Sequence, residues 1–164
     1  MRYLITFSCY GGRPTETTEA RWTDAIISSA ADGSRPLWNV SRQNVEAMLQ
    51  EPYAFDRTAR EVVLGALRQH CNYRGWNLLA AHARSNHVHV IVEAEIRPER
   101  IMSEFKVYAS RELNRVGSDG PARMRWARHG GTRWLWKDED VMRVLQYVID
   151  DQGEPMELFV AEEL

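Results

Sequence analysis

Apolar and polar side chains alternate in four short stretches of the chain, and this pattern predicts four β-strands. Gly11 and Gly12, which are typical turn residues, follow the first stretch. An irregular, arginine-rich stretch at residues 126–131 precedes the fourth. Because only a short turn separates the second stretch from the third, we expect these two strands to form a hairpin. The predicted strands cover residues 2–9, 76–83, 87–92 and 132–136.

Apolar residues at a spacing of three and four predict three helices. Asp56 or Thr58 can cap the first helix, and Gly75 can end it. Pro98 suits the first turn of the second helix, and Asp138 suits the cap of the third. The predicted helices run from about residue 55 to 74, from 98 to 113 and from 141 to about 151.

The predicted elements follow the order strand, helix, strand, strand, helix, strand, helix. This order is typical of the split β-α-β arrangement, also called ferredoxin-like, with one helix added at its C-terminal end. We therefore expect an α+β fold with a mainly antiparallel sheet, helices on one face and a single domain over residues 1–164. Residues 11–52 fit this pattern poorly, and we interpret them as a loop or insertion with helical pieces at residues 20–31 and 44–50.

Composition narrows the class of protein. Apolar residues make up 44% of the chain, enough for a core, yet no apolar run reaches the ~18 residues of a membrane span. The first strand is too short for a signal peptide, so we expect a cytoplasmic protein without membrane contact. Cys9 and Cys71 lack the spacing of a disulfide framework or a zinc knuckle. The net charge of −2 disfavours a nucleic-acid binder, but arginines cluster between Arg111 and Arg133 and can form a basic face.

The third predicted strand carries the main candidate for chemistry. His87, His89 and Ile91 fall on one face of this strand, and valines fall on the other. Two imidazoles two residues apart on one face are close enough to bind one metal ion. The alternative is a strand with two ordinary, half-buried histidines, and the pair alone does not separate these interpretations. We interpret the remaining histidines as structural or surface groups: His70, His82 and His129.

Three motifs in order resemble those of the small single-tyrosine transposases, namely the insertion-sequence-200-like and the REP-associated tyrosine transposases. His87-Val88-His89 resembles the HUH (His-hydrophobic-His) motif of that family. Residues 105–113 resemble its helix with the pattern Lys-Gly-x-Ser-Ser-Arg-x-Leu. Residues 133–136 and 144–152 resemble its Trp-Gly strand and its closing helix with the pattern Tyr-Ile-x-x-Gln. The resemblance covers about residues 1–10 and 55–155.

The resemblance implies an enzyme that cleaves and rejoins single-stranded DNA, often beside a hairpin. It implies a tyrosine that attacks a phosphodiester and keeps the 5′-phosphate, with Mg²⁺ or Mn²⁺ held by the two histidines and one amide side chain. Tyr147 aligns with this nucleophile, whereas Tyr108 falls within the apolar stripe of the preceding helix. We therefore predict Tyr147 as the nucleophile. The alternative for Tyr147 is a buried aromatic residue of an amphipathic helix.

The third metal ligand is open between two residues. In the family, the amide residue lies four positions after the tyrosine, one helical turn further on. Here that position is Asp151, whose hard carboxylate oxygens suit Mg²⁺. The next residue, Gln152, has the family's residue type but faces the metal only if the last turn is distorted or ended, as Gly153 can allow. We keep both candidates and favour Gln152.

Basic and aromatic residues supply candidate DNA contacts. Arginine and lysine can neutralise phosphates, and tryptophan can stack on unpaired bases. The alternative is that the tryptophans belong to the core and the arginines to a solvated face. The candidates are Lys106, Arg111, Arg128, Arg133 and Trp134, with Trp126 and Trp136 as further stacking residues.

Three functions are compatible with these features. The first is a single-stranded DNA transposase that cleaves and rejoins DNA near hairpins through a 5′-phosphotyrosine intermediate. The second is a domesticated or inactive relative that binds DNA hairpins without cutting. The third is an unrelated metal-dependent hydrolase or regulator built on His87 and His89. We expect single-stranded or hairpin DNA as the partner and a homodimer as the assembly, because the sheet leaves an edge that can pair with a second copy.

Overall fold

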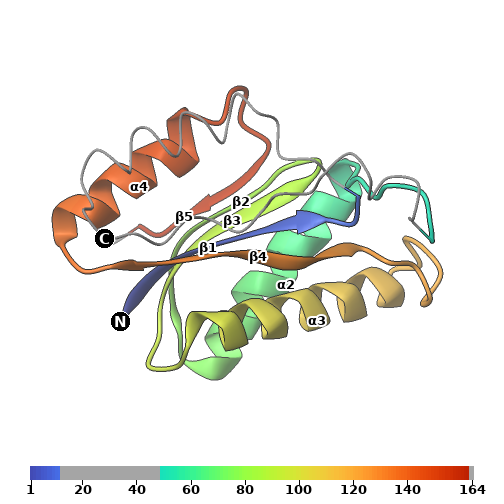
Figure 1. The fold of residues 1–164 in the computed structure, drawn as a ribbon, viewed down its shortest axis with the longest axis horizontal. Coiled ribbons are helices and arrows are strands. Elements are labelled where there is room, and N and C mark those ends of the chain that lie inside the picture. The colour runs from blue at the N-terminus through green and yellow to red at the C-terminus, as the bar shows by residue number, and fades with distance from the viewer. Residues whose placement is uncertain (12–48, 163–164) are drawn as a thin grey trace.

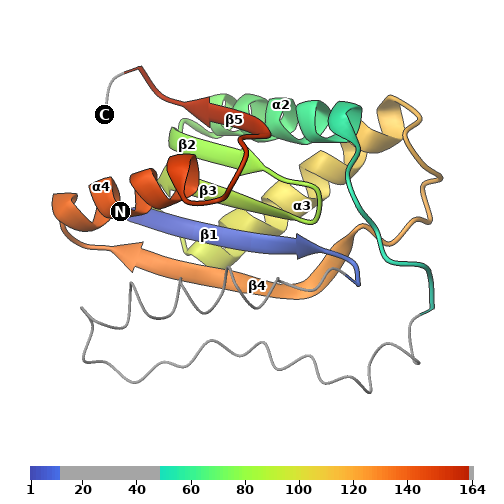
Figure 2. The same cartoon turned by 90° about the horizontal axis from the view of Figure 1, so that it is seen from above.

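The described part of the computed structural model, residues 1–11 and 49–162, forms one antiparallel sheet of five strands with three helices (Figure 1). The elements are β1 (Arg2–Cys9), α2 (Arg57–Arg74), β2 (Asn77–Ala83), β3 (His87–Glu93), α3 (Pro98–Arg115), β4 (Trp126–Leu135), α4 (Asp138–Asp150) and β5 (Glu157–Val160). The strands lie in the order β4-β1-β3-β2-β5, which Figure 2 shows from above. The predicted α+β fold with an antiparallel sheet is confirmed.

Strand β3 lies at the centre of the sheet. It pairs with β1 on one side and with β2 on the other, so both of its edges are hydrogen-bonded. Its valines are buried in the core that also holds residues of α2 and α3, whereas Ile91 is buried in the core under α4. The predicted alternation of this strand is therefore confirmed, and it places His87 and His89 on the face that α4 covers.

Helices α2 and α3 cover the other face of the sheet (Figure 1). Asp56 caps the start of α2, since its carboxylate accepts a hydrogen bond from the amide of Ala59 at 2.7 Å, and Gly75, with φ of 68°, caps the end. Pro98 is the first residue of α3. Phe7 of β1 and Phe105 of α3 are fully buried between the sheet and these helices.

Helix α4 packs on the histidine face of the sheet (Figures 1 and 2). Its apolar stripe packs on apolar residues of β1, β2, β3 and β4, and together they form a second, smaller core. The buried residues of this core are Leu4, Leu79, Ala80, Ile91, Leu135, Val141, Val144, Leu145 and Val148.

Three details differ from the prediction. Strand β4 begins at Trp126, so residues 126–131 belong to the strand, although its register against β1 shifts between Trp126 and Gly130. Its glycines obscured the strand pattern, yet Gly130 is needed there, because an added Cβ would come within 2.5 Å of the Thr6 carbonyl oxygen and the Met102 sulfur. Strand β5 was not predicted, since its four residues are too few to show an alternation. Helix α4 begins at Asp138 itself, which therefore does not cap it.

The predicted helical piece at residues 20–31, and nearly all of that at residues 44–50, lie outside the described residues. Cys9 and Cys71 are both buried free thiols. Within residues 1–11 and 49–162, no helix has the length and apolar character needed to cross a bilayer.

Candidate functional site

The two histidines of β3 lie side by side on the sheet, at the end of β3 that follows the hairpin turn. Their ring centroids are 4.7 Å apart and the ring planes meet at 76°. His89 is 4% exposed, because α4 and the neighbouring strands cover it, whereas His87 is partly exposed near the strand end. One imidazole is thus enclosed and the other is reachable from outside.

Each imidazole is oriented by a hydrogen bond at Nδ1. The Nδ1 of His89 lies 2.8 Å from the hydroxyl of Thr6 on β1, and the Nδ1 of His87 lies 2.6 Å from the Asn86 side-chain oxygen. A carbonyl oxygen only accepts, so His87 donates from Nδ1 and carries a lone pair on Nε2. The Nε2 atoms of both histidines are buried and make no hydrogen bond to a described residue. Nδ1 held by a neighbouring group, with Nε2 left for a ligand, is the usual arrangement of metal-binding histidines.

The surroundings keep both imidazoles neutral. Burial lowers the pKa of His87 to about 4, with the Gln152 side chain opposing the shift and the Arg84 charge adding to it. Burial, followed by the neighbouring His87, holds the pKa of His89 well below its usual range. Neutral imidazoles are the form that binds a metal ion, so the pair is ready for one at neutral pH.

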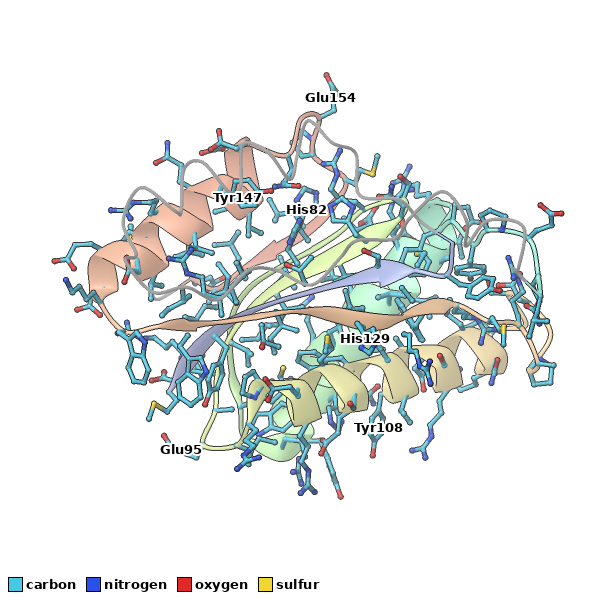
Figure 3. The ribbon with its side chains drawn as sticks, viewed as in Figure 1. His82, Glu95, Tyr108, His129, Tyr147 and Glu154 are labelled. Atoms are coloured by element: carbon cyan, nitrogen blue, oxygen red, sulfur yellow. The ribbon has the colours of Figure 1, made fainter. Side chains whose placement is uncertain are left out.

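Helix α4 brings Tyr147 to the histidines. The centroid of its ring lies 5.8 Å from that of His89, and the two planes meet at 78°. Figure 3 shows Tyr147 on the α4 side of the sheet and Tyr108 on the opposite side, below α3. Tyr108 stacks on the buried His70 with centroids 3.9 Å apart. Of the two candidate tyrosines, only Tyr147 shares a face of the sheet with the histidine pair.

Gln152 also reaches this place. Helix α4 ends at Asp150, and the amide of Asp151 closes the last turn on the carbonyl of Tyr147 at 3.2 Å. Beyond that turn the Gln152 side chain is buried beside both imidazoles, where it opposes the lowering of each pKa. Its Oε1 and Nε2 make no hydrogen bond to a described residue, whereas Asp151 is exposed. The structure therefore places Gln152, and not Asp151, against the histidine pair.

The described residues contain no group of three or more His, Cys, Asp or Glu side chains that could hold a metal ion. Among the described residues, a metal site at His87 and His89 can be completed by an amide, together with water or substrate. The buried amide of Gln152, with both of its polar atoms unused by the described residues, provides such a group.

Arg84 is a member of the site that the sequence pattern did not indicate. It follows β2 in the hairpin turn, and its Nη1 donates a hydrogen bond to the carbonyl of Glu154 at 3.1 Å. Burial lowers the pKa of Arg84, and the nearby Tyr147 opposes this shift. The Arg84 charge also lowers the pKa of both histidines. One positive charge thus lies within electrostatic reach of the tyrosine and the histidine pair.

Two predicted DNA contacts lie away from the histidines, because α3 covers the other face of the sheet (Figure 1). Lys106 donates hydrogen bonds to the carbonyls of Ala127 and His129 at 3.0 and 3.2 Å, so it ties α3 to β4. Arg111 is exposed on the same helix and lies over the ring of Tyr108, with its Cζ 4.9 Å from the centroid.

Trp134, a predicted contact on β4, also lies apart from the histidines. Trp134 pairs with Tyr3, whereas His87 pairs with Ser8, so about five residues of β1, or ~17 Å, separate the two positions. Trp134 and Trp136 stack at 5.1 Å near the far end of the sheet. Arg133 is partly buried near Asp140, and Arg128 is exposed. A DNA strand would have to follow the sheet for some distance to touch both Trp134 and His87.

Comparison with known protein families gives one match. The family described as Transposase IS200 like matches residues 44–139, more than half of the chain. This match includes His87 and His89 but stops before Tyr147. No curated protein matches the chain by sequence.

Two solved structures are similar in fold. A REP-associated tyrosine transposase bound to a REP hairpin superposes with a TM-score of 0.50 at 10% identity, over 92% of this chain. The chain spans 65% of the length of that structure. A putative transposase from Deinococcus radiodurans R1 superposes with a TM-score of 0.48 at 10% identity, over 90% of this chain and 88% of that one. With its sequence match over residues 44–139, the chain belongs to the IS200-like transposase family.

Proposed function

We propose that this protein cleaves and rejoins single-stranded DNA near hairpins, with Tyr147 as the nucleophile. The observation that carries the proposal is the meeting of three parts of the chain on one face of the sheet. The Nε2 atoms of His87 and His89, the amide of Gln152 and the ring of Tyr147 all lie there. Elements far apart in the sequence thus bring together one candidate nucleophile and three candidate metal-binding groups. A purely structural core would not need to gather buried polar atoms without hydrogen-bond partners among the described residues.

In the proposed reaction the phenol oxygen of Tyr147 attacks a phosphodiester. A bond forms between this oxygen and phosphorus, the bond from phosphorus to the 3′ oxygen breaks, and a 3′-hydroxyl leaves. The 5′-phosphate stays on the tyrosine as a diester, so a later attack by a 3′-hydroxyl reseals the strand without an external energy source. A phenol with a pKa near ~10 is mostly protonated at neutral pH. The Arg84 charge, close to Tyr147, stabilises the negative charge that develops on the phosphate.

A divalent cation, Mg²⁺ or Mn²⁺, fits the residues of this site. His87 and His89 would bind it through Nε2 and Gln152 through its side-chain oxygen, and these are the atoms that no described residue occupies. Such an ion polarises phosphate oxygens and neutralises part of their charge. Two imidazoles and one amide leave further positions for water and phosphate, as a catalytic site needs.

Hairpin DNA is the substrate class that we propose. The similar structure at a TM-score of 0.50 is a transposase bound to a REP hairpin, and this supports a hairpin as the ligand here.

A second candidate function is binding without cleavage. It is favoured by the family match, which covers the histidines and stops before Tyr147.

One experiment separates these functions. The protein is incubated with Mn²⁺ and a labelled pool of single-stranded oligonucleotides that share a hairpin stem and differ in their flanks. We expect a protein–DNA adduct that survives boiling in detergent, and we expect His87→Ala and His89→Ala to abolish it while circular dichroism shows an intact fold. His129→Ala, an exposed histidine on β4, is the control. Binding of the pool without an adduct would support the second function.

A further inference from the structure

His82 is a buried histidine on the same face of the sheet as the proposed metal site. It lies on β2 directly opposite His89 of β3, and none of its side chain is exposed. Figure 3 shows both His82 and Tyr147 on the α4 side of the sheet. The mechanism proposed above gives His82 no role, although it lies opposite His89 and is hydrogen-bonded to Val148, the residue after Tyr147.

Both ring nitrogens of His82 are hydrogen-bonded to main-chain groups. Its Nδ1 lies 2.8 Å from the carbonyl oxygen of Val148, and the amide of Met156 lies 3.1 Å from its Nε2. A carbonyl only accepts and an amide only donates, so the ring carries its hydrogen on Nδ1 and a lone pair on Nε2. This neutral tautomer satisfies both partners, and neither a charged ring nor the other tautomer does.

The two bonds hold the two ends of one short segment. Val148 belongs to the last turn of α4, whose carbonyls have no partner within the helix, and Met156 directly precedes β5. Gln152 lies midway between them, and Tyr147 directly precedes Val148. One side chain in the middle of the sheet thus fixes the segment that carries the proposed nucleophile and the proposed third ligand.

We propose that His82 is a positioning residue, which holds Tyr147 and Gln152 at the His87–His89 pair through its bonds to Val148 and Met156. The inference rests on the proposed function. His82 does not contact substrate in this scheme. Instead, it fixes the path of the chain after Tyr147. Because α4 ends at Asp150, helix geometry does not determine the position of Gln152.

Three substitutions separate the two bonds. His82→Leu removes both. The amide nitrogen of Asn lies where Nδ1 lies, so His82→Asn keeps the bond to Val148. The side chain of Gln reaches the place of Nε2, so His82→Gln keeps the bond to Met156. His70→Leu is the control. His70, a residue of α2 on the opposite side of the sheet, is also buried, and it is hydrogen-bonded to Glu104 of α3 at 2.8 Å.

The first readout is amide hydrogen exchange of the metal-free protein. We expect His82→Leu to speed exchange in residues 147–156 and to leave α2 and α3 protected. His82→Asn should restore protection mainly at the end of α4, and His82→Gln mainly around Met156. His70→Leu should speed exchange in α2 and α3 instead. An unchanged segment in His82→Leu would overturn the inference.

The second readout is Mn²⁺ affinity and adduct formation, measured at a temperature where each variant is folded. We expect His82→Leu to lose about 10- to 100-fold in Mn²⁺ affinity, with a lower rate of adduct formation at saturating hairpin and an unchanged half-saturating hairpin concentration. Partial recovery in His82→Asn or His82→Gln is expected. Equal losses in His82→Leu and His70→Leu would mean a general structural role and would overturn the inference. If the wild-type protein forms no adduct, the proposed function fails, and the exchange data still decide the role of His82.

Discussion

The amide of Gln152 faces the histidine pair because α4 ends two residues before it. Had the helix continued, Asp151 would lie one turn after Tyr147 and share its face. Instead the Asp151 amide closes the last turn, its side chain points to solvent, and the chain bends at Gly153, where φ is 80°. The position of a helix end thus decides which of the two side chains faces the histidine pair.

Replacing each of these two residues by alanine gives the first prediction. Gln152→Ala should weaken Mn²⁺ binding by about 10-fold or more, because it removes a direct ligand, whereas loss of an outer partner already costs about 10- to 100-fold. Asp151→Ala should leave the affinity unchanged. Calorimetric titration of the DNA-free protein with Mn²⁺ measures both. The reverse order of effects would assign the third ligand to Asp151.

Arg84 gives the second prediction. Its guanidinium lies within reach of Tyr147, so Arg84→Gln should slow adduct formation by about 100-fold, the typical cost of losing one group that stabilises developing charge. Arg57→Gln, an exposed arginine of α2, is the matched control and should behave as the wild type. Single-turnover assays with labelled hairpin compare the two. A rate for Arg84→Gln equal to that of the control would remove Arg84 from the site.

Sequence patterns located some of these residues and missed others for physical reasons. His87 and His89 stand out because a strand period of two places them on one face. Arg84 occupies a hairpin turn, where no period applies, so its approach to Tyr147 depends on tertiary packing. The same holds for His82, whose two partners lie 66 and 74 residues further along the chain.

At the scale of elements, the pairing of β4 with β1 holds in place the strand that contacts His89. Thr6 of β1 holds the Nδ1 of His89, and Gly130 and Gly131 of β4 lie against Phe7 and Thr6. A Cβ at position 130 would meet the Thr6 carbonyl at 2.5 Å, and a carbonyl in a sheet cannot move aside without shifting the strand. Gly130, one of the glycines that obscured the strand pattern of residues 126–131, therefore allows β4 to lie this close to β1.

Two glycine substitutions test this point. Gly130→Ala should lower the free energy of unfolding by about 1–3 kcal/mol, the usual cost of overpacking. Gly65→Ala should raise it by about 0.5–1 kcal/mol, because Gly65 lies inside α2 with nothing within 4 Å of an added Cβ. Urea denaturation followed by circular dichroism gives both values. A neutral Gly130→Ala would mean that β1 and β4 can separate at little cost.

At the scale of the whole molecule, the split β-α-β order could be predicted because long amphipathic helices and alternating strands dominate it. Strand β5 could not, since four residues show no period and its place beside β2 depends on the turn after Gln152. The proposed function also depends on the tertiary structure, because Tyr147 and the histidines come from separate elements. Only the fold places them on one face.

One chain brings the proposed nucleophile to the proposed metal ligands, since Tyr147 lies beside the His89 of its own sheet. Mixing His87→Ala protein with Tyr147→Phe protein should therefore not restore cleavage, whether or not the chain forms the predicted homodimer. Light scattering on the same mixture reports the assembly. Recovered cleavage would show that the tyrosine helix serves a second copy, and that the arrangement within one chain is not the active one.

The central claim is that Tyr147 becomes covalently attached to DNA. The most direct measurement is mass spectrometry of the adduct formed with the hairpin pool and Mn²⁺, after digestion of protein and DNA. We predict a nucleotide mass on the peptide that contains Tyr147, joined through a 5′-phosphate, and its loss in Tyr147→Phe but not in Tyr108→Phe. An adduct on Tyr108, or an attachment through a 3′-phosphate, would contradict the account.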